Sequence, residues 1–91
     1  MAYQIEFRPA ALKDLKAFPK RDLVRIKKKI EDIAANLPNP DQTRMKGRTD
    51  LHKVRVGDYR IIYMLEEECL MILIVKIGHR KDVYKNLPPQ Q

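Results

Sequence analysis

Six basic and aromatic residues in the second half of the chain have side chains that can act on a phosphodiester. They are Lys53, Arg55, Arg60, His79, Arg80 and Tyr84. Alternation along a strand predicts Lys53 and Arg55 on one face. Arg60 follows on the next strand, after a tight turn at Gly57 and Asp58. We expect an antiparallel meander to bring the six residues onto one concave surface.

Such side chains fit the cleavage of RNA by its own 2′-hydroxyl group, without a metal ion. The hydroxyl attacks the adjacent phosphate when a base takes its proton and cations stabilise the phosphorane; the products are a 2′,3′-cyclic phosphate and a 5′-hydroxyl. Arginine suits the cationic role because its guanidinium is bidentate and always charged. Two residues could be the general base, Lys53 or His79. Lys53 could act as a base only if neighbouring arginines favour its neutral form. The same residues could bind phosphates without any chemistry.

The positive charge of the chain is concentrated around these residues. The sequence has 19 Lys and Arg against 12 Asp and Glu, a net charge of +7, and residues 44–60 and 76–85 carry all of this excess. A localised positive field favours a polyanion such as nucleic acid, although a solvated basic surface is the plainer interpretation. We expect further contacts to RNA or the ribosome from four basic residues, Arg44, Lys46, Arg48 and Lys81.

Several other kinds of site are excluded by composition. The three glycines are isolated, so there is no glycine-rich phosphate loop, and one cysteine with two histidines cannot supply the spacing of a metal site. We therefore expect no cofactor and no metal, and we expect Cys69 to be a small core residue. The longest apolar run, residues 70–75, is too short for a membrane span, and the first ten residues lack a signal segment. A cytoplasmic, single-domain protein over residues 1–91 is expected.

Hydrophobic periodicity predicts an α+β fold that would position these residues. Residues 2–8 alternate as a strand, and residues 9–17 and 21–36 have the apolar spacing of two helices separated by a proline. Three more strands are predicted over residues 51–56, 59–65 and 70–77. The expected architecture is an N-terminal strand, a helical hairpin and a three-strand antiparallel meander in a mainly antiparallel sheet. Three consecutive lysines, Lys27, Lys28 and Lys29, lie largely off the apolar stripe of the second helix. They form either a solvated helix face or a contact to RNA.

Three segments make the chain similar to the RelE family within the RelE/ParE toxin superfamily. They are 10-AALKDLKAF-18, 44-RMKGRTDLHKVRVGDYRIIYML-65 and 77-IGHRKDVY-84, in this order. The resemblance implies a helical hairpin against a mainly antiparallel sheet, similar to small microbial ribonucleases. It also implies the toxin of a type II toxin–antitoxin system, an endoribonuclease that cleaves mRNA in the ribosomal A site by the 2′-hydroxyl route.

The resemblance also implies roles for individual residues. Lys53 would help activate the nucleophile and Arg60 would hold the phosphate in the transition state. Arg80 would assist the leaving oxygen, and Tyr84 would orient the base. Some members of the family have a second lysine where this chain has Arg55, which moves more of the base role onto Lys53 or His79.

The partners implied by the family are a RelB-like antitoxin, the A site of the small (30S) ribosomal subunit, and mRNA. A strongly positive surface suits an acidic, partly disordered antitoxin that covers the basic residues or displaces Tyr84. Two other functions remain open: a ParE-like poison of DNA gyrase, and an RNA or ribosome binder without catalysis.

Overall fold

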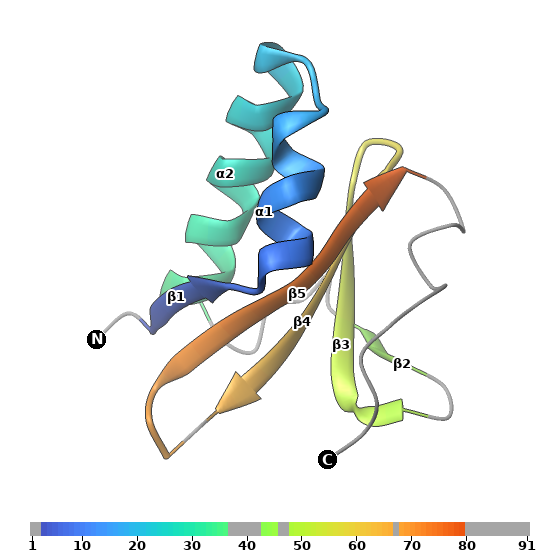
Figure 1. Ribbon diagram of the computed structural model, residues 1–91. Coiled ribbons are helices and arrows are strands. Elements are labelled where there is room, and N and C mark those ends of the chain that lie inside the picture. Colours follow the sequence, from blue (N-terminus) through green and yellow to red (C-terminus); the bar gives the residue numbers. More distant parts are fainter. Residues whose placement is uncertain (1–2, 37–42, 46–47, 67, 80–91) are drawn as a thin grey trace.

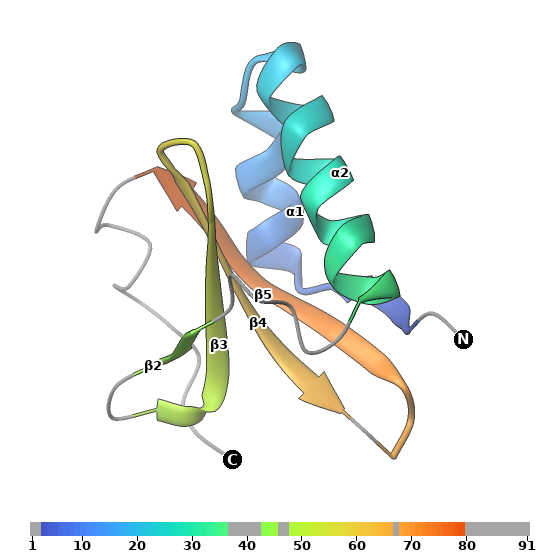
Figure 2. The ribbon, with the colours of Figure 1, turned by 180° about the vertical axis from the view of Figure 1, so that it is seen from behind.

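A helical hairpin covers one face of a five-stranded sheet in the computed structural model, as two opposite views show (Figure 1, Figure 2). The structure describes residues 3–36, 43–45, 48–66 and 68–79. The elements are β1 (Gln4–Phe7), α1 (Pro9–Lys16), α2 (Lys20–Ala35), β2 (Thr43–Met45), β3 (Arg48–Val56), β4 (Tyr59–Glu66) and β5 (Met71–His79). The strand order is β1-β5-β4-β3-β2, in which only β1 and β5 are parallel.

Prolines set the ends of the two helices. Pro9 occupies the first turn of α1, where its missing N–H costs no hydrogen bond. Pro19 separates α1 from α2, because a proline disfavours the helical conformation in the residue before it. Neither α1 nor α2, the helices of the described residues, is long and apolar enough to cross a membrane.

The main core lies between the helices and the sheet. Ile26, Ile30 and Ile33 form the buried stripe of α2, at the helical spacing seen in the sequence. They pack with Ile61 and Tyr63 of β4 and with other buried strand residues, among them Val54, Ile72, Ile74 and Ile77. A smaller cluster of Leu51, Ile62 and Val75 lies on the other face of the sheet, because it alternates with the first set along the strands.

A register shift in the pairing of β4 with β5 supports both clusters. Ile62 pairs with Lys76 whereas Tyr63 pairs with Ile74, so Val75 is an extra residue on β5. Such a bulge changes which face the following side chains occupy. It allows Ile74 and Ile77, three residues apart, to join the same core while Val75 joins the opposite cluster.

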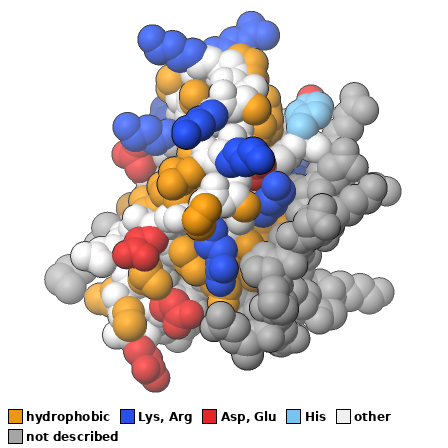
Figure 3. Space-filling view, in the orientation of Figure 1, with side chains coloured by type: hydrophobic (Ala, Val, Ile, Leu, Met, Phe, Trp, Pro, Cys, Tyr) orange, Lys and Arg blue, Asp and Glu red, His pale blue; other side chains and the backbone are white. Residues whose placement is uncertain are grey.

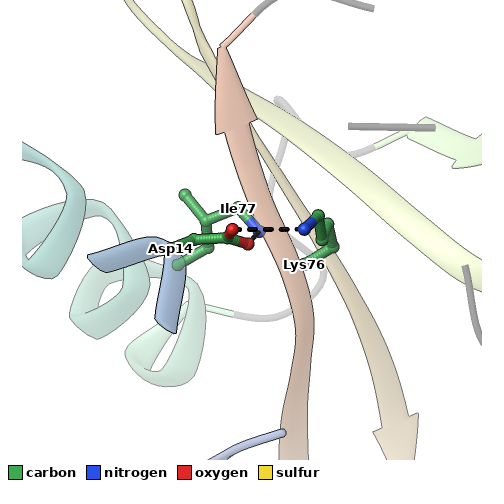
Figure 4. Close-up of polar contacts among 3 residues, drawn as sticks. All are labelled: Asp14, Lys76 and Ile77. Atoms are coloured by element: carbon green, nitrogen blue, oxygen red, sulfur yellow. Dashed lines mark hydrogen bonds and ion pairs between the residues drawn. The ribbon is translucent and has the colours of Figure 1, made fainter. Parts of the chain in front are cut away.

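The carboxylate of Asp14 on α1 completes the edge of β5. β1 is only four residues long and pairs with β5 from Met71 to Ile74. Beyond that point one oxygen of Asp14 accepts a hydrogen bond from the backbone N–H of Ile77 (3.2 Å), and the other accepts one from Lys76 Nζ (3.1 Å; Figure 4). Asp14 therefore takes the place of a further strand residue beside β5.

The expected fold class is confirmed, with three differences in detail. β2 was not expected: Arg44 pairs with His52, and β3 begins at Arg48 rather than at residue 51. A three-residue strand with a bulge between Arg44 and Met45 is too short and irregular to leave an alternation signal. Cys69 is exposed in the turn before β5 and was wrongly placed in the core. The adjacent Leu70, expected to begin the last strand, has φ +50°, a turn conformation, so β5 begins one residue later.

Replacing Asp14 tests its role at the edge of β5. Asp14→Ala leaves the N–H of Ile77 and the ammonium of Lys76 without their acceptor, so we expect the free energy of unfolding to fall by about 1–3 kcal/mol. Asp14→Asn keeps an acceptor oxygen and should cost less. Chemical denaturation measures both, with Glu66→Ala as an exposed acidic control. An Asp14→Ala loss no larger than that of the control would contradict this role.

Candidate nucleic-acid interface

Two arginines face each other across the β3–β4 hairpin. Arg55 pairs with Arg60, and Lys53, two residues before Arg55, lies on the same face. This is the face away from the helices, shared with the smaller cluster at Leu51 and Ile62. Arg55 is exposed, whereas Lys53 and Arg60 are half-buried. The register thus sets two positive side chains directly opposite each other on this face.

The position next to Arg60 on the other side is a glycine. Gly78 of β5 pairs with Arg60, in the same row as Arg55. Because glycine has no side chain, nothing projects from that position of β5 over the arginine pair. The row across β3, β4 and β5 therefore carries two arginine side chains and no third side chain.

His79 lies on the opposite face of the sheet from the arginines. It pairs with Tyr59, and the two rings meet edge-on with centroids 5.2 Å apart. Tyr59 belongs to the helix side, since its ring is 4.8 Å from that of Phe18 and its hydroxyl donates to Asp22 of α2 (2.9 Å). His79 Nε2 is also 3.8 Å from a carboxylate oxygen of Asp58. The structure therefore does not bring His79 together with the arginines.

The side chain of Tyr59 has a structural role, because its hydroxyl is hydrogen-bonded to Asp22 of α2. The hydrogen bond to the Asp22 carboxylate, together with loss of solvation and the negative charge of Asp22, raises the pKa of Tyr59 above its ordinary value. Arg25 and Arg21 oppose this rise. The phenol therefore stays protonated near neutral pH and holds the start of β4 against α2.

The second histidine also has a structural place, as the sequence indicates. His52 is 9% exposed, and its ring stacks on that of Tyr63 with centroids 5.6 Å apart. Burial raises the pKa of Tyr63, so this phenol is also neutral. His52 is part of the packing beneath the candidate surface.

Some predicted site residues lie outside the described parts of the chain. These are Lys46, Arg80, Lys81 and Tyr84. Arg44 lies in β2, which is the edge strand beside β3, and Arg48 is the first residue of β3. Among residues that the structure does describe, no group of three His, Cys, Asp or Glu side chains could hold a metal ion.

The Lys27–Lys29 segment divides between two different hollows. Lys28 and Lys29 line a basic hollow with Arg25 and Arg55, which the sequence analysis did not identify. The spacing of Arg21, Arg25 and Lys28 along α2, by four and three residues, is a signal that could have revealed it. Figure 3 shows Lys and Arg side chains along the helices, while Asp and Glu gather toward β1 and the β4–β5 turn.

Lys27 belongs instead to an apolar hollow of about 380 Å³ between β1 and the hairpin. Most of its lining is aliphatic or aromatic: Ile5, Phe7, Leu15, Leu23, Ile26 and Ile30. Only Lys27 and Glu31 add charged groups. The lining has no convergent set of bases or cations, so this hollow is not a candidate active site.

The chain is similar to toxins of toxin–antitoxin systems. The sequence model of a family described as the ParE toxin of the type II toxin–antitoxin system parDE matches residues 5–84. A protein of Methanocaldococcus jannaschii named as toxin RelE1 is 36% identical over 90 residues, covering 94% of this chain and 99% of that one. The mRNA interferase toxin RelE of Escherichia coli is 24% identical over 83 residues, covering 89% and 86%.

A solved structure supports the same relationship. A chain in the crystal structure of the archaeal RelE–RelB complex from Pyrococcus horikoshii is 30% identical and superimposes with a TM-score of 0.72. The match covers 89% of this chain and 98% of that one. The similarity therefore extends over the helical hairpin and the sheet together.

Gly57 sets the geometry of the turn that places Arg55 opposite Arg60. Its φ is +59°, and a Cβ there would lie 2.6 Å from a guanidinium nitrogen of Arg25. We expect Gly57→Ala to lower the free energy of unfolding by about 1–2 kcal/mol from backbone strain alone. Displacement of Arg25 adds to this.

A double-mutant cycle separates these two causes. In an Arg25→Ala background the close approach is gone, so Gly57→Ala should cost less than in the wild type when unfolding is followed by denaturant. Equal costs in both backgrounds would show that Arg25 does not contact the turn in solution.

Proposed function

The chain belongs to the RelE/ParE family of toxins of type II toxin–antitoxin systems, and from this we propose that it is an mRNA interferase. It is a metal-independent endoribonuclease that cleaves mRNA in the ribosomal A site and so stops translation. The observation that carries this proposal is the row of Arg55, Arg60 and Gly78 with Lys53 beside it, which places three cationic side chains on one face of the sheet. The relative in Escherichia coli bears the name mRNA interferase.

The proposed reaction needs only the groups of RNA and of this surface. The 2′-oxygen bonds to the adjacent phosphorus, and its proton passes to Lys53. The bond from phosphorus to the 5′-oxygen breaks, and that oxygen takes up a proton from water while the positive charge of Arg80 stabilises it. Arg55 and Arg60 stabilise the charge that builds on the phosphorane, which is where most of the rate is expected to arise. Tyr84 stacks on a base and orients it.

Lys53 is assigned as the base in preference to His79. Lys53 shares a sheet face with Arg55 and Arg60, and its neighbour on β4 is Ile62. His79 projects to the helix side, against Tyr59. A base must lie within hydrogen-bond reach of the proton that it removes, so a residue on the other face of the sheet is poorly placed.

The partners follow from the same proposal. A RelB-like antitoxin binds the toxin and covers its basic surface. The archaeal structure that resembles this chain is named as a RelE–RelB complex. The site of action is the cytoplasm, where the A site of the small ribosomal subunit presents mRNA. Arg44, Lys46, Arg48 and Lys81 supply backbone contacts to RNA, and residues 1–91 act as one toxin domain.

A gyrase poison is the second candidate function. The family description that matches residues 5–84 is that of ParE, which favours this alternative. The charged row at Arg55 and Arg60 favours the ribonuclease. A supercoiling assay with purified gyrase should show no inhibition by this protein if the ribonuclease proposal holds, and inhibition with mRNA left intact would replace it.

Cleavage in a reconstituted translation system tests the function directly. The purified protein should cut a defined mRNA within the A-site codon, and only when ribosomes are present. Arg60→Ala should lower the rate about 100- to 1,000-fold, the loss typical when one group that stabilises transition-state charge is removed. Mapping of fragment 5′ ends provides the measurement, and Lys13→Ala on α1 is a matched control for lost charge. Intact mRNA with the wild-type protein bound to ribosomes would instead identify a binder without catalysis.

The two candidate bases are distinguished by their variants. Lys53→Ala should reduce single-turnover cleavage by at least about 100-fold, the usual contribution of a general base. His79→Ala should stay within a few-fold of wild type at every pH, because His79 lies against Tyr59 on the other face. If His79→Ala instead lost most of its single-turnover cleavage rate, and its pH profile changed near neutrality, His79 would be the general base.

A further inference from the structure

A basic hollow lies between α2 and the end of β3, and it adjoins the row of proposed catalytic residues at Arg55. Its volume is about 440 Å³. The lining contains four cations and one carboxylate, with one apolar residue: Arg25, Lys28, Lys29, Arg55, Asp32 and Val56. Arg55 belongs to both surfaces, so the hollow continues the cationic row around the edge of the sheet.

The fold explains why this hollow exists. β2 pairs with β3 only as far as Lys53, so among the described strands none lies on the β2 side of the last residues of β3, whose other side pairs with β4. α2 passes this open edge, and its apolar stripe at Ile26, Ile30 and Ile33 turns toward the core. Arg25 and Lys28, three residues apart on one side of α2, then meet the edge of β3.

The cations in the hollow are held in place by the structure around them. The guanidinium of Arg25 lies against Gly57, where a Cβ would come within 2.6 Å of it. The backbone of Arg55 is fixed by its pairing with Arg60 in the β3–β4 hairpin. Positive groups on a helix and on a strand therefore converge on one space, and their mutual repulsion favours a bound polyanion.

We propose that this hollow binds the phosphodiester backbone of RNA and extends the catalytic surface beyond Arg55. The proposal rests on the function above in taking RNA as the ligand. Arginine forks suit phosphate oxygens, and open basic grooves follow nucleic-acid backbones. An acidic peptide is a poorer fit, because peptide docking relies on apolar anchors and the hollow offers only Val56.

Binding of RNA that cannot be cleaved isolates this proposal from catalysis. The probes are a labelled 2′-O-methyl single strand of about 12 nucleotides and a 2′-O-methyl hairpin duplex, which represent mRNA and ribosomal RNA. Both lack the 2′-hydroxyl nucleophile. Fluorescence anisotropy between about 50 and 200 mM salt gives the affinity and its salt dependence. The proteins are the wild type, Arg25→Gln/Lys28→Gln, Lys28→Gln alone, and the control Lys13→Gln/Lys16→Gln, which removes the same charge from α1.

We expect Arg25→Gln/Lys28→Gln, the double variant of the hollow, to bind RNA at least about fivefold more weakly than the wild type. For the single strand, the salt slope of its affinity should be lower by about 1.4. Lys28→Gln alone should lower that salt slope by about 0.7. The α1 control should change affinity less than twofold. The probe that shows the larger effect identifies whether single-stranded or duplex RNA fills the hollow. Lys28 is exposed and makes no packing contact of the core, so its variant reports binding even if Arg25→Gln disturbs the turn.

Two results would overturn the proposal. Equal losses of RNA affinity in the double variant of the hollow and in the α1 control would mean that only net charge determines binding. Competition by an oligoglutamate peptide that depends on Arg25 and Lys28, with RNA binding unchanged in the variants, would make the hollow a peptide site. Groove-dependent RNA binding by a protein that cuts no mRNA on ribosomes would contradict the ribonuclease function and leave this proposal standing.

Discussion

The edge of β5 depends in part on a carboxylate from a helix. β5 is nine residues long and lies beside the four-residue β1, so more than half of its edge needs another partner. Asp14 supplies it by accepting hydrogen bonds from the Ile77 N–H and from Lys76. This contact ties α1 to the sheet at the point where Ile77 enters the core and where Gly78 comes beside Arg60. The geometry of the basic row is therefore linked to the packing of the hairpin.

Strand register then separates two environments within a few residues. Arg55 and Arg60 share one face with Lys53, whereas Tyr59 and His79 share the other. On the first face, like charges meet across the hairpin. On the second, the Tyr59 hydroxyl bonds to Asp22, and the contact serves packing. Because of the bulge at Val75, apolar side chains of β5 pack on both faces of the sheet.

Charge is distributed along the molecule in a way that suits a nucleic-acid ligand. Lysines and arginines follow the helices, while acidic side chains gather near β1 and the β4–β5 turn (Figure 3). The basic row and the basic hollow meet at Arg55, and Asp32 is the one carboxylate among the described residues that line the hollow. The family to which the chain belongs places this surface in a toxin, and an acidic antitoxin would compete for the same charges.

Sequence periodicity was sufficient for the helices, for the three long strands and for the pairing of Arg55 with Arg60. These features are local, since apolar spacing and the Gly57–Asp58 turn fix them over a few residues. Long-range packing decided the rest. β2 carries no alternation signal, and Cys69 lies in a turn although it begins an apolar run. The faces of His79 and Arg60 depend on how β5 pairs with β4. The basic hollow requires α2 and the end of β3, about 30 residues apart in the chain, to come together in the folded protein.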